Sequence, residues 1–401
     1  MSPGVPKEGL TPAEAVAQYR ELSTGSPEEF RPHLASALGV LGNRLADEGR
    51  PEEALVATEE AVGLFRELAR QQPEEFILFL AGNLRNLGLR FDALGRHDEV
   101  RAADEESVAL FRELHRQDPT EFTFEFAASL DNLGATLADL GDAEKAVAAR
   151  EEAVGLCREL VLQRSDQSIP RLAGWLAKLG LSYLELGRLG DALAVSEESV
   201  SIRRELVLER PDLFTSHLAA SLFSLGHVLA SMGHQQEALS ATEESVNLRR
   251  EMAQQAPDHP DPVLAGWLDI LRDRFDAVGR REDATGIAEE AVTVRRALAA
   301  RRPDTFMPDL AGSLIVLAPF LIQMGRNSEG LSVMEEGVHL ARELARHQPD
   351  SVTPLDLALS LSSQGTMLLH VGQHANALPP HAGGDRAVSR SGAGGTRESP
   401  A

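Results

Sequence analysis

The sequence predicts an all-α fold, in which antiparallel helical hairpins follow one another along the chain as an α-solenoid. A glycine and a proline each recur with a period of 46 residues, and the apolar residues between them keep helical spacing. The glycines are Gly49, Gly95, Gly141, Gly187, Gly233, Gly279 and Gly325, and Gly372 follows 47 residues later. The prolines are Pro27, Pro73, Pro119, Pro211, Pro257, Pro303 and Pro349, with Ser165 in the one gap. Each copy therefore holds two segments between helix breakers.

The array is expected to begin with half a hairpin. Residues 1–11 are expected to be a flexible N-terminus, and residues 12–23 align with a second segment that lacks its first. Thr11 is placed as the helix cap, Pro12 lies in the first turn, and Glu14 is positioned to complete a capping box. We therefore expect a lone second helix before the first complete hairpin.

The first segment of each copy, such as Leu34 to Gly49, carries one apolar stripe. Two leucines three residues apart recur in all seven copies, and a large apolar residue follows four residues later. The leucines are Leu38, Leu84, Leu130, Leu176, Leu222, Leu268 and Leu314, and then Leu41, Leu87, Leu133, Leu179, Leu225, Leu271 and Leu317. Spacing of three and four places these residues on one buried face of a helix.

The second segment carries small residues where the first carries leucines. They recur as Ala54, Val100, Ala146, Ala192, Ala238, Ala284 and Gly330, and seven residues later as Ala61, Ser107, Ala153, Ser199, Ser245, Ala291 and Gly337. Small residues seven apart permit the close approach of a neighbouring helix. The glycine suits a left-handed end of the first helix, and the proline is expected to stop the second.

The seven hairpins are predicted over residues 34–348, and a lone first helix over residues 357–371 ends an array that spans residues 12–372. Residues 373–401 are rich in Gly, Pro, Ser and Arg and have no apolar stripe, so we expect this tail to be disordered. The alternative is that the tail is a truncated eighth hairpin.

These repeats resemble the tetratricopeptide-repeat family. The matching positions in the first copy are Leu38, Leu41, Gly42, Leu45, Ala54 and Ala61, and the glycine recurs as Gly88, Gly134, Gly180 and Gly226. The usual repeat has 34 residues, and this longer variant is similar to the repeats of kinesin light chains and of many bacterial repeat proteins. The resemblance implies a right-handed superhelix whose first helices line a concave groove.

Arginine and glutamate each return at one place in all eight second segments. The arginines are Arg20, Arg66, Arg112, Arg158, Arg204, Arg250, Arg296 and Arg342, and the glutamates are Glu14, Glu60, Glu106, Glu152, Glu198, Glu244, Glu290 and Glu336. Six residues correspond to about 240° around a helix, so an arginine cannot meet the glutamate six residues before it. We predict a structural ladder, in which each arginine pairs with a carboxylate of a neighbouring hairpin.

Function is expected where the copies differ. The resemblance places the variable positions of the first helices in the groove, where an asparagine of related repeats holds the backbone of an extended peptide. The candidate groove residues are Asn43, Arg85, Asn86, Asp131, Asn132, Lys178, Phe223 and His227. Gly39, Ala128 and Asn132 stand where the family's carboxylate clamp has basic residues, so binding of a C-terminal carboxylate is not expected.

Charge indicates the kind of partner. The chain has 62 acidic against 39 basic residues and a formal net charge of −23, so nucleic acid is not expected to bind. The acids that map to the groove are Asp47, Asp92, Asp131, Asp139, Glu185, Asp269, Asp273 and Asp276, which favour a basic or polar protein or peptide. Solubility alone is the alternative role of these acids.

The stretch Leu314–Ile322 is the most apolar part of the chain. It is too short to span a bilayer and is interrupted by Pro319, so no membrane segment is expected. A helix that is apolar on every side needs a cover, which could be the lone helix after it, a second copy in a homodimer, or a partner. Together with Phe223 it could also form an apolar end of the groove, through Ile315, Pro319 and Ile322.

No enzyme signature appears in the sequence, so no catalytic residue, cofactor or metal ligand is expected. Cys157 aligns with Phe65 and Phe111 and is expected to fill the core; a single cysteine and the absence of a signal-peptide pattern favour the cytoplasm. The predicted function is a scaffold or adaptor that binds a partner segment in the groove. The alternatives are a sensor or regulatory array of a bacterial signalling system, acting with a nucleotide-switch or protease partner in trans, and an enzyme.

Overall fold

The computed structural model describes residues 10–163, 168–255, 260–347 and 354–370, and all regular secondary structure in these ranges is helical. Contacts divide the chain into two compact units, Met1–Gln255 and Ala256–Ala401. The tail predicted at 373–401, and residues 1–9 of the N-terminus predicted to be flexible over 1–11, lie outside the described residues. That the two units continue one array stays a prediction from the period.

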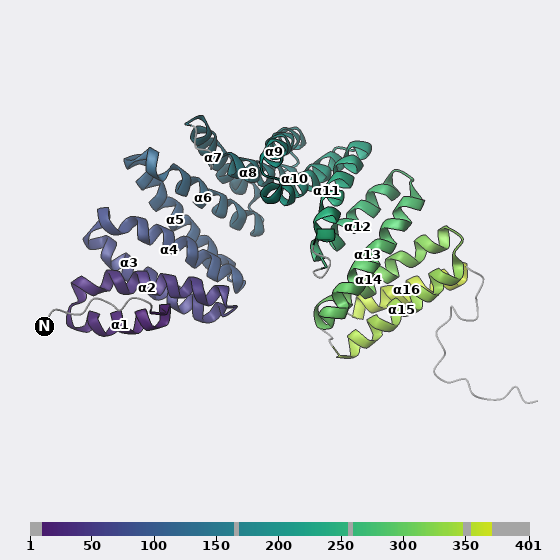
Figure 1. The fold of residues 1–401 in the computed structure, drawn as a ribbon, viewed down its shortest axis with the longest axis horizontal. Helices are drawn as coiled ribbons and strands as arrows, with labels where there is room; N and C mark the ends of the chain where they lie inside the picture. Colours follow the sequence, from purple (N-terminus) through teal and green to yellow (C-terminus); the bar gives the residue numbers. More distant parts are fainter. Residues whose placement is uncertain (1–9, 164–167, 256–259, 348–353, 371–401) are drawn as a thin grey trace, which may run out of the picture. The chain divides into compact units, whose positions relative to one another are not determined.

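The first unit consists of helices α1 to α11, which alternate in direction as hairpins (Figure 1). Their bounds are α1 Pro12–Gly25, α2 Pro27–Asp47, α3 Pro51–Gln71, α4 Pro73–Ala93, α5 His97–Gln117, α6 Pro119–Asp139, α7 Ala143–Leu162, α8 Ser168–Glu185, α9 Leu189–Glu209, α10 Pro211–Ser231 and α11 Gln235–Gln255. The second unit contains α12 Pro262–Ala277, α13 Arg281–Arg301, α14 Pro303–Gln323, α15 Asn327–His347 and α16 Pro354–His370.

The recurring glycines and prolines lie at helix ends. All seven turn glycines from Gly49 to Gly325 have positive φ, between 68° and 82°, which confirms the left-handed helix ends. The prolines, however, begin the next helix as well as ending the previous one: α2 starts at Pro27 and not near Leu34. Proline suits the first turn because its fixed φ is helical and the missing N–H has no partner there. The first helices are therefore longer than expected.

The predicted apolar stripe forms the core of each unit. Leu38, Leu84, Leu130, Leu176 and Leu222 in the first unit, and Leu268 and Leu314 in the second, are at most 2% exposed. Most of the small residues facing them from the second helices are equally buried, among them Ala54, Ala146, Ala192 and Ala238. Cys157 is fully buried, and desolvation raises the pKa of its thiol to about 11, so it is core and not a nucleophile.

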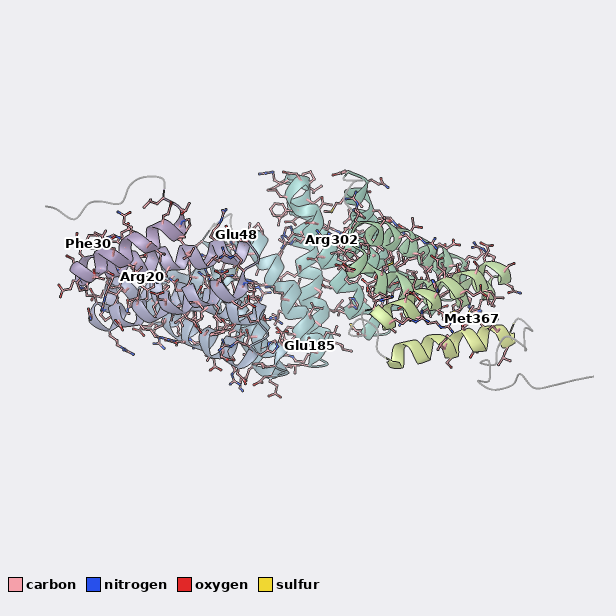
Figure 2. All side chains as sticks on the ribbon, turned by 90° about the horizontal axis from the view of Figure 1, so that it is seen from below. Arg20, Phe30, Glu48, Glu185, Arg302 and Met367 are labelled. Carbon is pink, nitrogen blue, oxygen red and sulfur yellow. The ribbon has the colours of Figure 1, made fainter. Side chains whose placement is uncertain are left out.

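The predicted Arg–Glu ladder is present on the second helices. Six of the eight arginines pair with the glutamate 40 residues later: Arg20–Glu60, Arg66–Glu106, Arg112–Glu152, Arg158–Glu198 and Arg204–Glu244 in the first unit, and Arg296–Glu336 in the second. Arg20, labelled in Figure 2, lies 2.6 Å from Glu60. Because these side chains are about half exposed, each pair is worth only about 0–1 kcal/mol. The ladder sets the register between neighbouring hairpins more than it adds stability.

The apolar stretch Leu314–Ile322 is largely covered within the chain. Helix α14 continues through Pro319 without a break, so this proline lies in the interior of the helix. Met367 of α16, labelled in Figure 2, packs in one cluster with Ala318 and Ile322, so the lone helix provides the cover. This leaves Ile322 unavailable as an apolar end of the groove, and leaves little of the stretch for a homodimer.

Two described helices, α10 and α14, are long and apolar enough to cross a membrane by length and composition. In each, 44% of the apolar window is buried against other helices of the chain. The core helix of a packed array passes the same test, so this finding is weak evidence for a membrane segment.

Candidate partner-binding surface

The first helices of the first unit share one side of the arc. In Figure 1, α2, α4, α6, α8 and α10 lie on its inner side, and the second helices between them lie on its outer side. Contacts between α2 and α4 and between α8 and α10 agree with this arrangement. All eight candidate groove residues lie on these inner helices. We call this side the inner face.

Three of the candidates lie on α2 and α4. Asn43 is exposed, and its Oδ1 accepts a hydrogen bond of 2.8 Å from Nη2 of Arg90. Arg85 and Asn86 are half-buried, and the Asn86 amide makes no hydrogen bond within the described part of the chain. Asn86 therefore keeps both its donor and its acceptor for a ligand, although its role in binding stays a prediction.

Asp131 is buried, unlike the other candidates on the inner face. It is 4% exposed and lies 2.5 Å from Nζ of Lys178 and 4.0 Å from Nε of Arg150. Arg150 is itself buried and donates to the hydroxyl of Ser182. Asp131 and Lys178 thus form a link between α6 and α8, and Asp131 offers no free carboxylate to a partner. The sequence analysis expected Asp131 in the groove, because the 46-residue period does not show which side chains of other helices cover it.

Phe223 and His227 lie one turn apart on α10, with their rings edge to face and the ring centres 4.8 Å apart. Both are half-buried, so they form a small aromatic patch on the inner face. Asn132 is also half-buried, and it lines a small cavity between α4, α5 and α6. The candidates thus lie at several separate places along the inner face.

The cavity beside Asn132 has a volume of about 90 Å³ and an acidic wall. Its lining residues are Gly88, Leu89 and Asp92 of α4, Val100 and Asp104 of α5, and Asn132, Ala135, Thr136 and Asp139 of α6. Asp92 and Asp139, two of the acids expected in the groove, are exposed beside it, and Leu89 is 51% exposed. We call this feature the acidic cavity.

Asp104 is the buried member of the acidic cavity. Its side chain is 5% exposed, and Oδ2 accepts a hydrogen bond of 2.7 Å from the hydroxyl of Thr136. Desolvation raises the pKa of its carboxyl to about 6; the Thr136 hydrogen bond opposes this shift, and the negative charge of Asp92 adds to it. Ionising this buried carboxyl at neutral pH therefore lowers the free energy of unfolding of the protein.

The sequence analysis missed Asp104 because the residue lies on a second helix, where only constant positions drew attention. Its place in the repeat is occupied by Thr58, Asp104, Arg150, Ser196 and Thr242 in the first five hairpins. In each, this residue lies against the glycine of the preceding helix, from Gly42 to Gly226. Two charged residues among three small polar ones are the signal that could have revealed the cavity.

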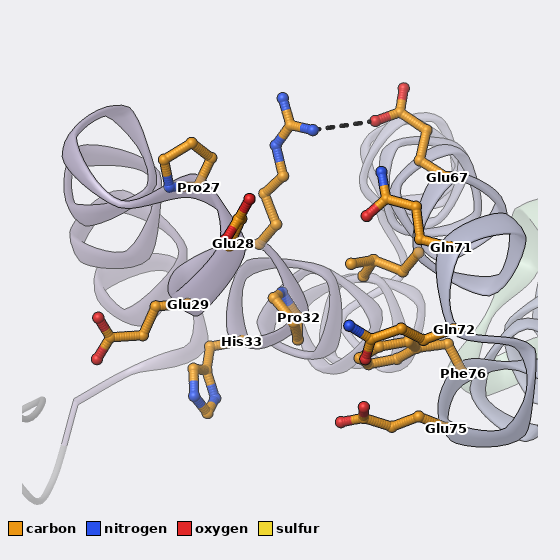
Figure 3. A pocket seen from close by; sticks show the side chains of 12 residues that line it. Pro27, Glu28, Glu29, Pro32, His33, Glu67, Gln71, Gln72, Glu75 and Phe76 are labelled. Carbon is orange, nitrogen blue, oxygen red and sulfur yellow. Dashed lines mark hydrogen bonds and ion pairs between the residues drawn. The ribbon is translucent and has the colours of Figure 1, made fainter.

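A larger pocket of about 650 Å³ lies at the ends of α2, α3 and α4, away from the candidate residues. Figure 3 shows its lining, with a dashed line for the ion pair between Arg31 and Glu67, whose atoms are 3.3 Å apart. Glu29 and Glu75 on its wall are exposed. The carboxylates on the wall of this pocket are exposed to solvent. The pocket therefore has no counterpart of Asp104, the buried carboxylate of the acidic cavity.

In the second unit, one of the three acids expected in the groove, Asp269, is paired with cations of the chain. Asp269 of α12 accepts from Arg272 at 2.8 Å and from Arg295 of α13, and Arg295 donates to the hydroxyl of Ser313. Asp269 therefore joins α12 to α13 and offers little to a partner. Across the described residues, no group of three His, Cys, Asp or Glu side chains is placed to hold a metal ion.

Comparison with known proteins supports the repeat assignment. A tetratricopeptide-repeat family model matches residues 126–164 and 172–211, and the model for anaphase-promoting complex subunit 5 matches residues 195–257 and 265–357. The sequence comparison with curated proteins gave no match.

Among solved structures, the apo form of RapI shares the fold at 15% identity, with a TM-score of 0.51 over 78% of this chain and 99% of RapI. BtubC (BKLC) from P. vanneervenii has 23% identity and a TM-score of 0.49 over 63% of this chain and 92% of that one. A putative kinesin light chain from Podosopora anserina has 19% identity and a TM-score of 0.42 over 56% and 98%. The tetratricopeptide-repeat model covers less than half of the chain, and together with the 46-residue helical hairpins it makes these repeats similar to tetratricopeptide repeats.

Proposed function

We propose that this protein is a scaffold or adaptor, which binds a segment of another protein along the inner face of its first unit. Tetratricopeptide repeats bind protein partners generally. The observation that carries the proposal is a division within each first helix: the stripe that packs the core is constant, whereas the positions on the inner face change from copy to copy. Residues kept for packing would repeat, so the variable face is the part free to recognise a partner.

The chemistry of the inner face supports a basic or polar partner. Asp92, Asp139 and Glu185 are exposed on α4, α6 and α8, and the chain as a whole carries a net charge of −23. Leu89 and Leu181 are exposed between these acids and would contact apolar parts of the same segment. We propose the cytoplasm as the compartment, because the one cysteine is a buried free thiol.

The test is differential capture of partners from a lysate of the native cell. The full chain, immobilised as wild type, as Asn86→Ala/Asn132→Ala and as Asn247→Ala, is used as bait, and bound proteins are quantified by mass spectrometry. Asn247 is a matched control, because it is an exposed asparagine on an outer helix, α11. We expect the double variant to lose a partner that the wild type and the control retain, and retention to weaken as salt rises. Equal capture by all three baits would refute the groove assignment.

A further inference from the structure

We propose that the acidic cavity between α4, α5 and α6 receives the cationic end of an arginine or lysine side chain from the protein partner. The inference rests on the proposed function and deepens it, since it names the group that the partner supplies and the residue that holds it. Asp104 is the counter-charge, and Asp92 and Asp139 lie beside it on the cavity wall.

The first argument is an unpaired buried carboxylate. Among the described residues, Asp104 and Asp131 are the two acids that are buried. Asp131 has two cations near it, Lys178 at 2.5 Å and Arg150 at 4.0 Å. Asp104 has no cation within ion-pair distance in the described part of the chain, and its single hydrogen bond comes from the neutral hydroxyl of Thr136. Buried charges in proteins are paired, so a position for a cation is open beside Asp104.

The second argument is the form of the cavity. Oδ1 of Asp104 faces the bare Cα of Gly88, where a Cβ would lie only 2.7 Å from it. The cavity volume of about 90 Å³ is several times what one water molecule needs, so it can hold an ammonium or guanidinium group. Leu89 and Ala135 on the wall provide apolar surface for the methylene groups of a lysine or arginine stem.

A side chain fits these walls better than a divalent metal ion. Calcium takes six to eight oxygen ligands at about 2.3–2.6 Å. The wall holds carboxylates of Asp92, Asp104 and Asp139, but these are not placed as a group that could hold a metal, and the remaining wall is largely apolar. A guanidinium group instead needs acceptors spread around a plane, which Asp104 and the Asn132 amide oxygen can supply.

Protonation of Asp104 gives the binding a characteristic pH dependence. The titratable groups around it are Asp92 on α4 and Asp139 on α6, and Arg150 on α7 interacts with Asp139. Because the pKa of the Asp104 carboxyl is about 6, it is mostly ionised at pH 7.5 and mostly neutral at pH 5.0. A cation should therefore bind more weakly at pH 5.0.

The experiment uses N-acetyl-arginine amide as the probe and the neutral, nearly isosteric N-acetyl-citrulline amide as its control. Affinities for the full chain are measured by NMR titration at pH 7.5 and 5.0 for the wild type, Asp104→Asn and Glu105→Gln. Glu105 is adjacent on α5 but exposed and paired with Arg101, so its variant removes the same charge from outside the cavity. We expect the arginine probe to bind the wild type and Glu105→Gln alike, and to bind Asp104→Asn and the wild type at pH 5.0 at least tenfold more weakly.

Equal binding of the two probes, or equal affinity of the arginine probe for Asp104→Asn and the wild type, would overturn the proposal. Binding of calcium chloride through Asp104 with no response to the arginine probe would overturn it in favour of a metal site. These outcomes are independent of lysate capture, because a partner can still bind the inner face through Asn86 and Asn132 when the cavity takes no cation.

Discussion

Replacing Asp104 by asparagine should make the protein more stable at neutral pH. Asparagine keeps the size of the side chain and an oxygen that accepts the hydrogen bond from Thr136, but it removes the buried charge. The folded-state pKa is about 6 against 3.8 for an ordinary aspartate, a difference of roughly two units, and each unit is worth about 1.4 kcal/mol. The variant should therefore gain up to about 3 kcal/mol at pH 7.

The sign follows from proton binding. Between pH 3.8 and about 6 the folded state holds a proton on Asp104 that the unfolded state releases, so raising the pH through this window destabilises the wild type. The variant has no such group. The difference in free energy of unfolding should thus be largest above pH 6, shrink through the window, and vanish below pH 3.8.

The assay is urea unfolding followed by circular dichroism, for wild type and variant, at intervals of half a pH unit from 4 to 7.5. Glu105→Gln serves as the control, and its midpoint should stay close to that of the wild type because Glu105 belongs to an exposed ion pair. Thermal midpoints should agree, with a shift of about 6 °C or more. A variant that is no more stable than the wild type at pH 7 would refute the assignment of Asp104 as a desolvated carboxylate with a raised pKa. A difference in free energy of unfolding that does not change with pH would refute it as well.

Three further predictions concern the core. Arg203 is buried, its Nε has no hydrogen bond, and desolvation lowers its pKa to about 10, so Arg203→Met should raise the urea midpoint; a lower midpoint would show that the guanidinium is satisfied. Leu130→Ala should cost about 2–5 kcal/mol by leaving a cavity. Leu162→Ala, at a residue 83% exposed, is its control and should change stability by less than about 0.5 kcal/mol; similar losses would contradict the packing. Cys157 should resist a thiol reagent in the native protein at pH 8 and react in urea; rapid native reaction would contradict its burial.

The repeat made most of the fold predictable from one sequence. Leucines, small residues and turn glycines recur in phase. The first leucine of each copy is buried and the glycines turn the chain as expected, whereas Leu41, Leu133 and Leu225 of the second series are only half-buried. The Arg–Glu ladder could also be deduced, because an arginine that cannot reach a glutamate on its own helix must use a neighbour. Helix starts were harder, since a proline that ends one helix can also begin the next, as Pro27 does.

The candidate site was less predictable. Which variable residues reach solvent depends on neighbours from other hairpins, and these contacts leave no trace in the period. Asp131 occupies the same repeat position as Arg85, yet Lys178 and Arg150 lie against its side chain. Asp104 lies on a second helix, and its importance appears only when the missing cation, the Thr136 hydroxyl and the bare Gly88 are seen together.

The most direct test of partner binding on the inner face is zero-length cross-linking of the captured complex with a carbodiimide, which joins carboxylates to amines in contact. Mass spectrometry then locates the cross-linked acids. We expect partner lysines to be joined to Asp92 and Asp139 on α4 and α6. Cross-links confined to acids of the outer helices, such as Glu59 on α3 or Glu113 on α5, would contradict binding along the inner face.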